Sequence, residues 1–441
     1  MRPEPGIQRE GMASGRRRWR VAGPGWASRR GSIYLFVLII AMLVSVVGVS
    51  AITLCRVNIR RTQAAADNGE ARSLAGSAVE AAIAAVNADA NWRSHHLSGQ
   101  ETPQLAFGAG TLSWRLIDAD GDLSDDPSDP VRVLGTGRAG QSVWVYGAML
   151  NYTTPLDALR TCIHCAGQFS IMNGRSLIAD GAPASTNADL YMEDNSFLYG
   201  DVEAASRTGS QGTVTGTETI PASPKALPGA NVIANYIAKA TALPYNGDFD
   251  RVVLSPVVNE YGGGLNADGV YFLSSGGHDL TIHSSRIHGT LVLDVGGNKL
   301  VIDRQVSIEP YRTDCPTLIV VGDADLEYTS AGAYGDRYLQ ESAVGHNFNP
   351  PGAPYEGQSD SDTDDAYPSQ ISGLVHIAGN LKLGQSAFVQ GTILCGGSAV
   401  VEGDCRITYD PAIAASPPLG YADPASPLAV TSGSWRREPA N

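Results

Sequence analysis

Residues 33–54 have the sequence IYLFVLIIAMLVSVVGVSAITL, an uninterrupted apolar run without a charged side chain. As an α-helix this run would be roughly 33 Å long, which is enough to cross a hydrocarbon core of about 30 Å. A cleavable secretory h-region usually has only about 7–15 apolar residues, and no A-x-A-like site follows this run. The sequence therefore predicts one membrane-spanning helix near the N-terminus.

Charge is distributed unevenly on the two sides of this helix. Residues 1–61 contain eleven Arg and two acidic residues, whereas residues 62–441 contain 20 basic and 43 acidic residues. Positive charge before the helix keeps that end in the cytoplasm, so we expect a single-pass protein of the bacterial inner membrane. Its body would lie in the periplasm or on the cell surface. An acidic body repels phosphate backbones, which argues against nucleic-acid binding.

The helix is expected to continue beyond the membrane. Residues 56–92 contain no Pro and are rich in Ala, and apolar residues recur at helical spacing between Leu74 and Val86. We assign residues 1–31 to a basic cytoplasmic leader and residues 32–92 to one helix, half in lipid and half outside.

A basic leader that ends in Gly31, an apolar helix and an amphipathic extension resemble type IV pilins and type II secretion pseudopilins. The segment RRGSIYLFVLIIAMLVSVVG, at residues 29–48, is similar to the starts of PilX-type minor pilins and of the K-type pseudopilin. The resemblance covers roughly residues 29–150. It implies that a prepilin peptidase cleaves between Gly31 and Ser32. It also implies assembly with other pilin or pseudopilin subunits on an inner-membrane platform. A plain signal anchor would show the same short pattern.

One position departs from the pattern of this family. Most major pilins carry Glu at the fifth residue after the cleaved Gly, whereas this chain has Phe36. In the family that Glu is thought to neutralise the N-terminal amine of the neighbouring subunit. Its absence implies a place at the filament tip or in initiation, as is believed of the K-type pseudopilin.

Residues 93–166 are predicted to form a small head with an antiparallel sheet. Strand candidates at 111–117, 131–134 and 142–152 are separated by turn-rich stretches. A long helix followed by such a sheet is the pilin arrangement. Residues 135–140, GTGRAG, have the glycine spacing of a dinucleotide-binding loop, but an alternating strand follows where a helix would be needed. We interpret this segment as a hairpin turn.

The loop between the first two predicted strands is rich in carboxylates. They match positions 1, 3, 5, 9 and 12 of a calcium-binding loop. These residues are Asp118, Asp120, Asp122, Asp126 and Asp129. The glycine of an EF-hand would stand where Leu123 is, and strands flank the loop in place of helices. The loop is either a solvated acidic turn or a calcium site, and the resemblance supports calcium because some pseudopilins hold it in a sheet-side loop.

Residues 167–411 contain short β-segments ended by Gly, Asn or Asp. One pair of Gly-led segments starts at Gly269 and Gly289, and a second pair starts at Gly373 and Gly391. Periods of about 20 residues with strand–corner–strand units are typical of solenoids. We therefore expect a β-solenoid similar to bactofilins, with a β-sandwich as the alternative. The predicted fold class is a membrane-anchored α+β protein: a long N-terminal helix with a small antiparallel sheet, followed by a mostly-β, β-helix-like solenoid.

Two inserts and a tail complete the predicted organisation. Residues 204–250 are rich in Ser, Thr, Gly and Pro, although residues 230–242 could form a helix packed on the side. Residues 329–370 have the composition of a loop. Residues 412–441 are rich in Pro and Ser, and we expect a disordered tail.

The six cysteines allow disulfides in an exported body. Cys395 and Cys405 flank a Gly-rich corner, and Cys162 and Cys165 form a C-x-x-C motif. No second C-x-x-C completes a zinc site, and no βαβ context indicates a thioredoxin. We predict Cys395–Cys405 and Cys162–Cys165 as disulfide candidates.

The sequence offers little catalytic chemistry. No H-E-x-x-H, G-x-S-x-G or P-loop motif occurs. Three histidines spaced five apart would fall on opposite faces of a strand, which favours scattered surface residues over metal ligands. They are His278, His283 and His288. Four acids in a Ser-rich loop could suggest a calcium-dependent polysaccharide lyase, but without a nearby Lys or Arg a solvated loop is favoured. They are Asp360, Asp362, Asp364 and Asp365.

We therefore expect no enzyme, but a structural minor pilin or pseudopilin-like subunit of a type IV pilus or type II secretion-like system. No cofactor is certain, and calcium is the one candidate. The alternative is a membrane-anchored β-solenoid that acts as a carbohydrate-active enzyme or an adhesin.

Overall fold

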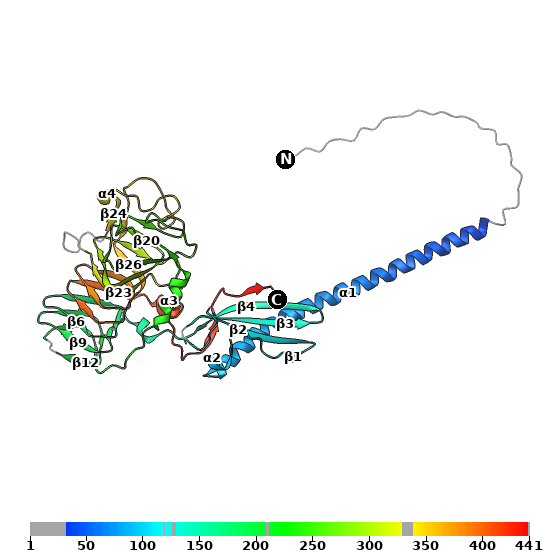
Figure 1. Cartoon of the computed structure of the whole chain (residues 1–441), viewed down its shortest axis with the longest axis horizontal. Coiled ribbons are helices and arrows are strands. Elements are labelled where there is room, and N and C mark those ends of the chain that lie inside the picture. The colour runs from blue at the N-terminus through cyan, green and yellow to red at the C-terminus, as the bar shows by residue number, and fades with distance from the viewer. Residues whose placement is uncertain (1–31, 119, 126–128, 209–210, 329–337, 440–441) are drawn as a thin grey trace, which may run out of the picture. The chain divides into compact units, whose positions relative to one another are not determined.

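The computed structural model describes residues 32–118, 120–125, 129–208, 211–328 and 338–439 (Figure 1). The chain divides into two compact units, Met1–Ala66 and Asp67–Asn441. The first unit consists, as far as it is described, of the first part of one long helix. The second contains the rest of that helix, a head sheet and a solenoid.

Helix α1 runs over Ser32–Ala88, which confirms the predicted continuous helix. It is long and apolar enough to cross a membrane, so it is compatible with a single-pass anchor. Hydroxyl groups inside the apolar stretch are satisfied within the helix. Ser45, Ser50 and Thr53 each donate to the carbonyl four residues earlier, at 2.7–2.8 Å. Such bonds are what an apolar environment requires, because it offers no water as a partner.

The head is an antiparallel sheet that packs on the second part of α1. A short helix, α2 (Trp92–His95), follows α1. The sheet order is β1-β2-β3-β4-β31, with β32 also paired to β4. Its strands are β1 (Leu105–Phe107), β2 (Gly110–Ile117), β3 (Val131–Ala139), β4 (Ser142–Tyr152), β31 (Leu428–Val430) and β32 (Arg436–Glu438). The three predicted strands are present, and the third predicted region has the bounds of β4.

The C-terminal tail is ordered, so the prediction of a disordered segment at 412–441 was wrong. Strands β31 and β32 pair antiparallel with β4, in the registers Leu428↔Tyr152 and Arg436↔Gly147. Asn87 on α1 also holds the tail, because its side chain donates to the Leu428 carbonyl at 2.8 Å and accepts from the Leu428 amide at 2.7 Å. Backbone pairing of this kind does not depend on composition, which is why the Pro- and Ser-rich sequence did not reveal it.

Glycines let α1 approach the head sheet closely. A Cβ at Gly135 would lie 2.5 Å from the Ala75 carbonyl oxygen, and one at Gly137 would overlap the Ala71 carbonyl oxygen. Ala71 and Ala75 present the small surface on the helix side, and both are fully buried. Of the hairpin turn predicted at 135–140, only the last part forms a turn. Gly135 and Gly137 lie inside β3, whereas Gly140 (φ 53°) forms the hairpin to β4.

The solenoid is a stack of coils with three parallel faces, which we name A, B and C. Face A contains β13 (Thr213–Val214), β10 (Phe197–Tyr199), β7 (Ser176–Asp180), β30 (Cys405–Thr408), β28 (Phe388–Cys395), β26 (Gln370–Ile377), β22 (Ser307–Glu309), β20 (Arg286–His288) and β17 (Val253–Leu254). Face B contains β14 (Glu218–Thr219), β11 (Val202–Glu203), β8 (Ala184–Thr186), β5 (Ile163–Cys165), the second halves of β28 and β26, β23 (Leu318–Glu327), β21 (Thr290–Asp303), β18 (Val270–Ser274) and β15 (Thr241–Ala242). Face C contains β12 (Ser206–Thr208), β9 (Asp189–Met192), β6 (Phe169–Ile171), β29 (Ala399–Val401), β27 (Leu381–Leu383), the second halves of β23 and β21, β19 (Leu280–His283) and β16 (Phe249–Asp250).

The fold confirms the predicted solenoid, and the parallel pairing excludes the β-sandwich. The predicted repeats lie on neighbouring coils, since Val270 pairs with Thr290 and Gly373 with Gly391. A Cβ at Gly391 would overlap the Gly373 carbonyl oxygen, so these glycines allow the coils to turn at this corner. Apolar side chains from all three faces fill a single core along the stack.

The chain enters the solenoid in its middle, not at an end. Strand β5 pairs with β8 on one side and with β28 on the other, and β30 pairs with β7. From β5 the chain winds outward to β14 at one end of the stack. It resumes at β15 at the other end and winds back to β30. In Figure 1 the orange strands near the C-terminus lie beside β6, which comes far earlier in the sequence.

The central part of face B is buried on both sides. Its outward side chains include Val292, Ile319, Leu374 and Leu394, and these pack under three short helices. The helices are η1 (Asp157–Arg160), α3 (Ala230–Lys239) and α5 (Pro411–Ala415). This double burial explains why the face B parts of β21 and β23 are continuous apolar runs. Helix α3 confirms the helix expected within 230–242.

The first predicted insert has different bounds from those expected, whereas the second lies between β23 and β26 as predicted. The first was placed at 204–250, but β12, β13 and β14 lie within the stack, so the coils continue to Thr219. Of the second, residues 329–337 lie outside the described part of the chain. The rest forms a small subdomain with β24 (Tyr338–Gln340), α4 (Glu341–Val344) and β25 (Ala366–Pro368). Its apolar cluster includes Leu339, Phe348 and Tyr367 and packs on Val253.

Two histidines are buried under the cover of face B. His376 shares a hydrogen bond of 3.0 Å between its Nδ1 and the Tyr421 hydroxyl, and His164 shares one of 3.1 Å between its Nδ1 and Ser185 Oγ. Burial lowers the pKa of each imidazole to about 4, because the charged form would lose its hydration. Lys225 nearby lowers the pKa of His164 further.

We expect Gly137→Val to destabilise the head by about 1–3 kcal/mol, because the added methyl groups would meet the helix backbone. Four of the six Trp lie in the head, two lie in the leader and none lies within residues 155–427. The change in tryptophan fluorescence on heating in detergent therefore separates unfolding of the head from that of the solenoid. The control is Gly76→Ala on α1, where a Cβ meets nothing within 4 Å and helix propensity should raise stability slightly. An unchanged melting temperature for Gly137→Val would contradict the close approach.

The buried histidines should make the solenoid sensitive to acid. The unfolded chain binds a proton at each His near pH 6.5, whereas the folded chain does so only near pH 4. The free energy of unfolding should therefore fall as the pH drops from 6.5 to 4, by up to roughly 3 kcal/mol per histidine. Urea titrations followed by far-UV circular dichroism measure this slope. His376→Gln and His164→Asn should each flatten it, and an equal slope in the double variant would refute the assignment.

Candidate functional site

The acidic loop between β2 and β3 is the candidate metal site. Its backbone is held from three directions. Leu123 is buried in the head core. Arg93 donates to the carbonyls of Leu123 (3.1 Å) and Asp129 (2.8 Å). Ser98 Oγ accepts the Asp118 amide at 3.0 Å. The described residues at both ends of this loop are thus fixed to the head.

Four carboxylates gather in this loop. Each of Asp118, Asp120, Asp125 and Asp129 offers one oxygen, and these oxygens all lie within 4.8 Å of one another. Asp118 and Asp129 are buried, with 5% and 8% of their surface exposed, whereas the other two are exposed. Asp129 also accepts a hydrogen bond from Asn235 Nδ2 at 2.6 Å. Oxygen donors in this number and spacing suit calcium, which takes six to eight oxygen ligands.

The predicted ligand set agrees with this cluster only in part. Asp118, Asp120 and Asp129 are brought together, and Asp126 lies outside the described residues. Asp122 is not in the cluster: its Oδ1 accepts the amide (3.0 Å) and hydroxyl (2.7 Å) of Ser124. These hydrogen bonds lower the pKa of Asp122. Asp125 was not predicted, because the spacing of a helix-flanked calcium loop does not apply between two strands.

Of the two residues that flank the predicted cleavage site, the structure describes only one. Gly31 lies outside the described residues, and Ser32 is the first residue of α1. Cleavage between them therefore stays a prediction. Phe36, the fifth residue after Gly31, is 65% exposed on the first turns of α1.

All six cysteines are free thiols, so both predicted disulfides were wrong. Cys395 ends the face B part of β28 and donates to the Gly379 carbonyl at 3.2 Å, whereas Cys405 begins β30 on face A and donates to the Ser176 carbonyl at 3.8 Å. Cys162 and Cys165 donate to the carbonyls of Ala182 and Ser185. Burial raises the pKa of Cys162 and Cys395 to about 11, which keeps these thiols protonated.

The three histidines spaced five apart do not converge. His278 stacks on Tyr245 with ring centroids 5.5 Å apart, and His288 contacts the edge of Tyr311 at 5.3 Å. His283 lies between Asp250 (3.4 Å) and Asp303 (3.3 Å) on face C. The prediction of separate surface histidines agrees with these positions.

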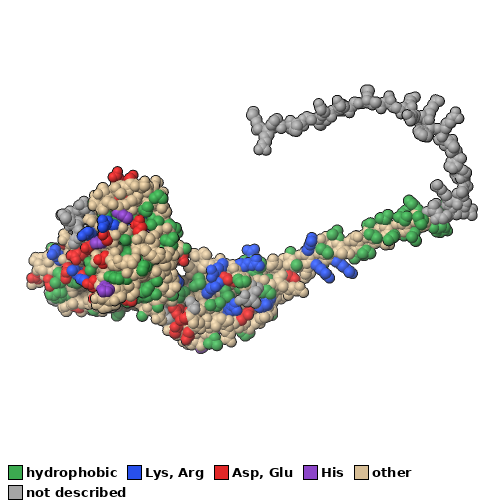
Figure 2. Space-filling view, turned by 45° about the horizontal axis from the view of Figure 1, so that its top comes forward, with side chains coloured by type: hydrophobic (Ala, Val, Ile, Leu, Met, Phe, Trp, Pro, Cys, Tyr) green, Lys and Arg blue, Asp and Glu red, His purple; other side chains and the backbone are tan. Residues whose placement is uncertain are grey.

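Acidic, basic and histidine side chains gather on one side of the solenoid (Figure 2). On face C the charges pair across neighbouring coils. Lys299 Nζ lies 2.7 Å from Asp325 Oδ2, and Lys382 Nζ lies 3.3 Å from Glu402 Oε2. The hydrogen bond with Asp325 raises the pKa of Lys299. Burial lowers the pKa of Lys382, but the hydrogen bond with Glu402 and the nearby acids outweigh burial, so its pKa is also raised. These ion pairs hold both lysines in their charged form and connect neighbouring coils.

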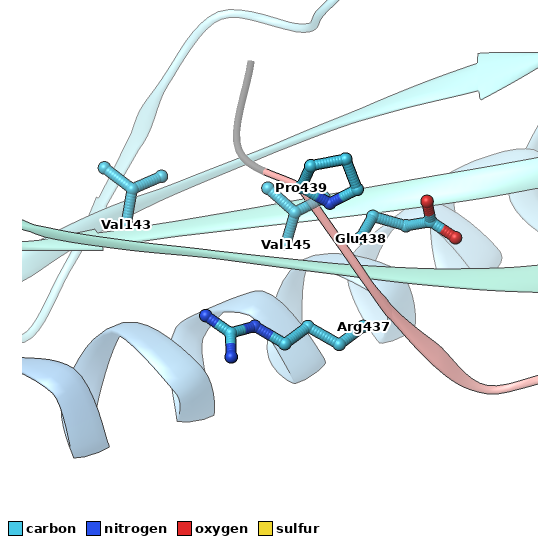
Figure 3. Close-up of a pocket in the computed structure, with 5 residues that line it drawn as sticks. All are labelled: Val143, Val145, Arg437, Glu438 and Pro439. Atoms are coloured by element: carbon cyan, nitrogen blue, oxygen red, sulfur yellow. The ribbon is translucent and has the colours of Figure 1, made fainter.

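One small pocket lies on the head, where the C-terminal strand crosses β4 (Figure 3). It is lined by Val143, Val145, Arg437, Glu438 and Pro439. Its charged groups already have partners. Glu438 pairs with Arg132 and, at 2.7 Å, with Arg436, and the Arg437 guanidinium lies 3.9 Å from the ring centroid of Trp144.

No protein-family model matches the chain, and no curated protein matches it. Three solved structures show low similarity. The competence-associated pilin ComZ from Thermus thermophilus is 12% identical, with a TM-score of 0.32, over 84% of this chain and 98% of that one. An ice-binding protein from the Antarctic ascomycete Antarctomyces psychrotrophicus is 14% identical, with a TM-score of 0.27, over 58% and 99%. The Shewanella frigidimarina ice-binding protein is 10% identical, with a TM-score of 0.23, over 59% and 98%. At these TM-scores the similarities to known proteins are weak, and the PilX-type and K-type assignments stay predictions.

If the head loop binds calcium, calcium should raise the melting temperature of the head by linkage, and Asp120→Ala should abolish that rise. Tryptophan fluorescence measures it on the full chain, with and without a chelator. Asp122→Ala is the matched control: its carboxylate bonds Ser124 outside the cluster, so the calcium response should persist. A head that melts at the same temperature with calcium and with chelator would leave only an acidic turn.

Proposed function

We propose that this chain is a structural, non-enzymatic subunit of a type IV filament or type II secretion-like system, of the minor-pilin or pseudopilin class. The observation that carries the proposal is α1. One uninterrupted helix has an apolar surface long enough to cross a membrane and then a stripe of small residues buried under an antiparallel sheet. Such a helix serves as a membrane anchor before assembly and as a packing element in a filament core afterwards.

The N-terminus supports a place at the filament tip or in initiation. After cleavage at Gly31, the new amine of Ser32 would need a carboxylate partner if a neighbouring subunit buried it. The first acidic residue after Gly31 is Asp67, and Phe36 cannot supply the charge. A subunit without that carboxylate adds poorly within a shaft but tolerates the end. The large solenoid, which spans residues 163–408, also fits the end, because a domain of this size would be hard to pack along a filament shaft.

The proposed partners follow from this role. A prepilin peptidase would cleave the leader, and other pilin or pseudopilin subunits would bind α1 on an inner-membrane assembly platform. The PilX-type and K-type classes are the proposed relatives. Calcium in the head loop would hold the β2–β3 connection in one conformation. The rival function, a membrane-anchored carbohydrate-active enzyme or adhesin, shares this architecture but places the active surface on the solenoid.

We expect the mature protein in its native host to begin at Ser32, which mass spectrometry of the purified chain measures. Gly31→Leu should leave the leader attached and remove the protein from filaments. Gly48→Ala, where a Cβ meets nothing within 4 Å, is the matched control and should be processed normally.

Immunogold labelling of isolated filaments tests the position. Labels confined to filament ends agree with the tip role, whereas uniform labelling along the shaft contradicts it. An uncleaved N-terminus in cells that process their other pilins would contradict the pilin class itself and favour a plain anchor.

A further inference from the structure

The two terminal coils of the solenoid stack each have a neighbouring coil on only one side. At one end the outermost strands are β13 on face A, β14 on face B and β12 on face C, and their described residues pair with β10, β11 and β9. Figure 1 shows β6, β9 and β12 in successive coils toward this end. The outer edges of the terminal strands and the top of the apolar core form a surface on which the coils of a second molecule could stack.

Two core positions in this terminal coil are charged. Residues that pair in register project to the same side, so the inward residues of successive coils form columns in the core. On face C Arg207 pairs with Leu190, and on face B Glu218 pairs with Val202. Leu190, Val202 and the next three residues of each column are apolar and almost fully buried. Those residues are Phe169, Ala399 and Leu381 on face C, and Ala184, Ile163 and Ile393 on face B.

The two charged side chains meet across the end of the core. Arg207 Nη1 forms an ion pair with Glu218 Oε1, and Arg207 Nη2 donates to the Gly212 carbonyl at 2.7 Å. Because Gly212 lies between β12 and β13, the arginine connects the three faces of the terminal coil. The side chain of Arg207 is 19% exposed and that of Glu218 is 34% exposed, so both stay in contact with water. A partly hydrated ion pair thus occupies the place where a further coil would require apolar side chains.

The other end of the stack is closed by a segment of its own chain. Tyr261 stacks on Phe249, an inward residue of β16, with the ring centroids 3.9 Å apart. Leu254 forms an antiparallel bridge with Asn259, so the outer edge of β17 is already paired there. A second molecule could pair with this end only by displacing residues 259–261.

We propose that the Arg207–Glu218 ion pair is a charged cap that keeps a second copy of this chain from stacking on the solenoid. Two such ends brought together would remove both ion pairs from water, and the loss of hydration opposes association. Apolar residues at the same two positions would extend the core columns and favour stacking. Inward-pointing charge is one of the ways in which proteins protect strand edges from pairing with other molecules. The cap is independent of the proposed filament role.

The double variant Arg207→Leu with Glu218→Val tests the cap, because it extends each column with the residue type of the coil below. The full chain carrying both changes should stay folded, since exchanging an ion pair for apolar residues of similar size costs little stability. In analytical ultracentrifugation in detergent, its protein mass should be twice that of the unchanged chain at the same concentration. The association should stop at the dimer, because the other end is closed. A mass equal to that of the unchanged chain would overturn the proposal.

Two control variants separate the cap from a general effect of added apolar surface. Lys225→Leu with Glu203→Val removes an ion pair of similar exposure, with 2.9 Å between Lys225 Nζ and Glu203 Oε2, beside the inward residue Val202. Glu203 projects outward from face B, so this variant should keep the mass of the unchanged chain. Arg207→Glu with Glu218→Arg exchanges the two charges and keeps both side-chain sizes, so it tests the charge even where the apolar variant is unstable. It should also keep the mass of the unchanged chain, and dimers in either control would refute the cap.

Discussion

The parallel backbone pairing of residues 393–395 with Ile163–Cys165 is the contact on which the architecture depends. It joins the last coils of the solenoid to its first strand, which comes far earlier in the chain. A solenoid that starts in its middle is complete only when β29 and β30 return beside β6 and β7. Before that contact forms, the first coils expose one edge of unpaired N–H and C=O groups to water. Closure pairs these groups with β28, β29 and β30 and buries the apolar side chains beneath them.

This closure brings the strands where the chain enters and leaves the solenoid into the same coil, so the chain can return to the head that it left. The chain leaves the head after β4 and returns to it as β31 and β32, which both pair with β4. The solenoid is thus inserted into the head sheet, and the head needs residues from both sides of it. The tail is ordered because it is the missing part of a sheet, held by Asn87 and by the ion pair between Arg132 and Glu438.

Local sequence patterns predicted the elements that depend on side-chain periodicity within one segment. The uncharged run at 33–54, the helical Ala stripe and the apolar face B strands each follow from side-chain periodicity. The mid-stack entry could not be predicted, because no local pattern specifies that Cys395 pairs with Cys165. The same limit explains the disulfide error, since spacing in sequence placed Cys395 near Cys405 while the coil geometry directs them to different carbonyls. In the acidic loop the sequence identified the carboxylate-rich segment but not the correct set of four. Between two strands the loop brings Asp125 into the cluster and directs Asp122 to Ser124.

Small residues on α1 and β3 allow the helix to pack closely on the sheet into which the solenoid is inserted. Gly135 and Gly137 on β3 meet the helix backbone at Ala75 and Ala71, so the head can pack only on a helix that has small side chains at those positions. Asn87, further along the same helix, binds the returning strand at Leu428. One helix therefore contacts both the strands before the solenoid and the strand after it. The folded solenoid brings the two ends of its chain close together, so its folding lowers the entropic cost of returning β31 to β4 and Asn87. The stability of the head is therefore coupled to that of the solenoid.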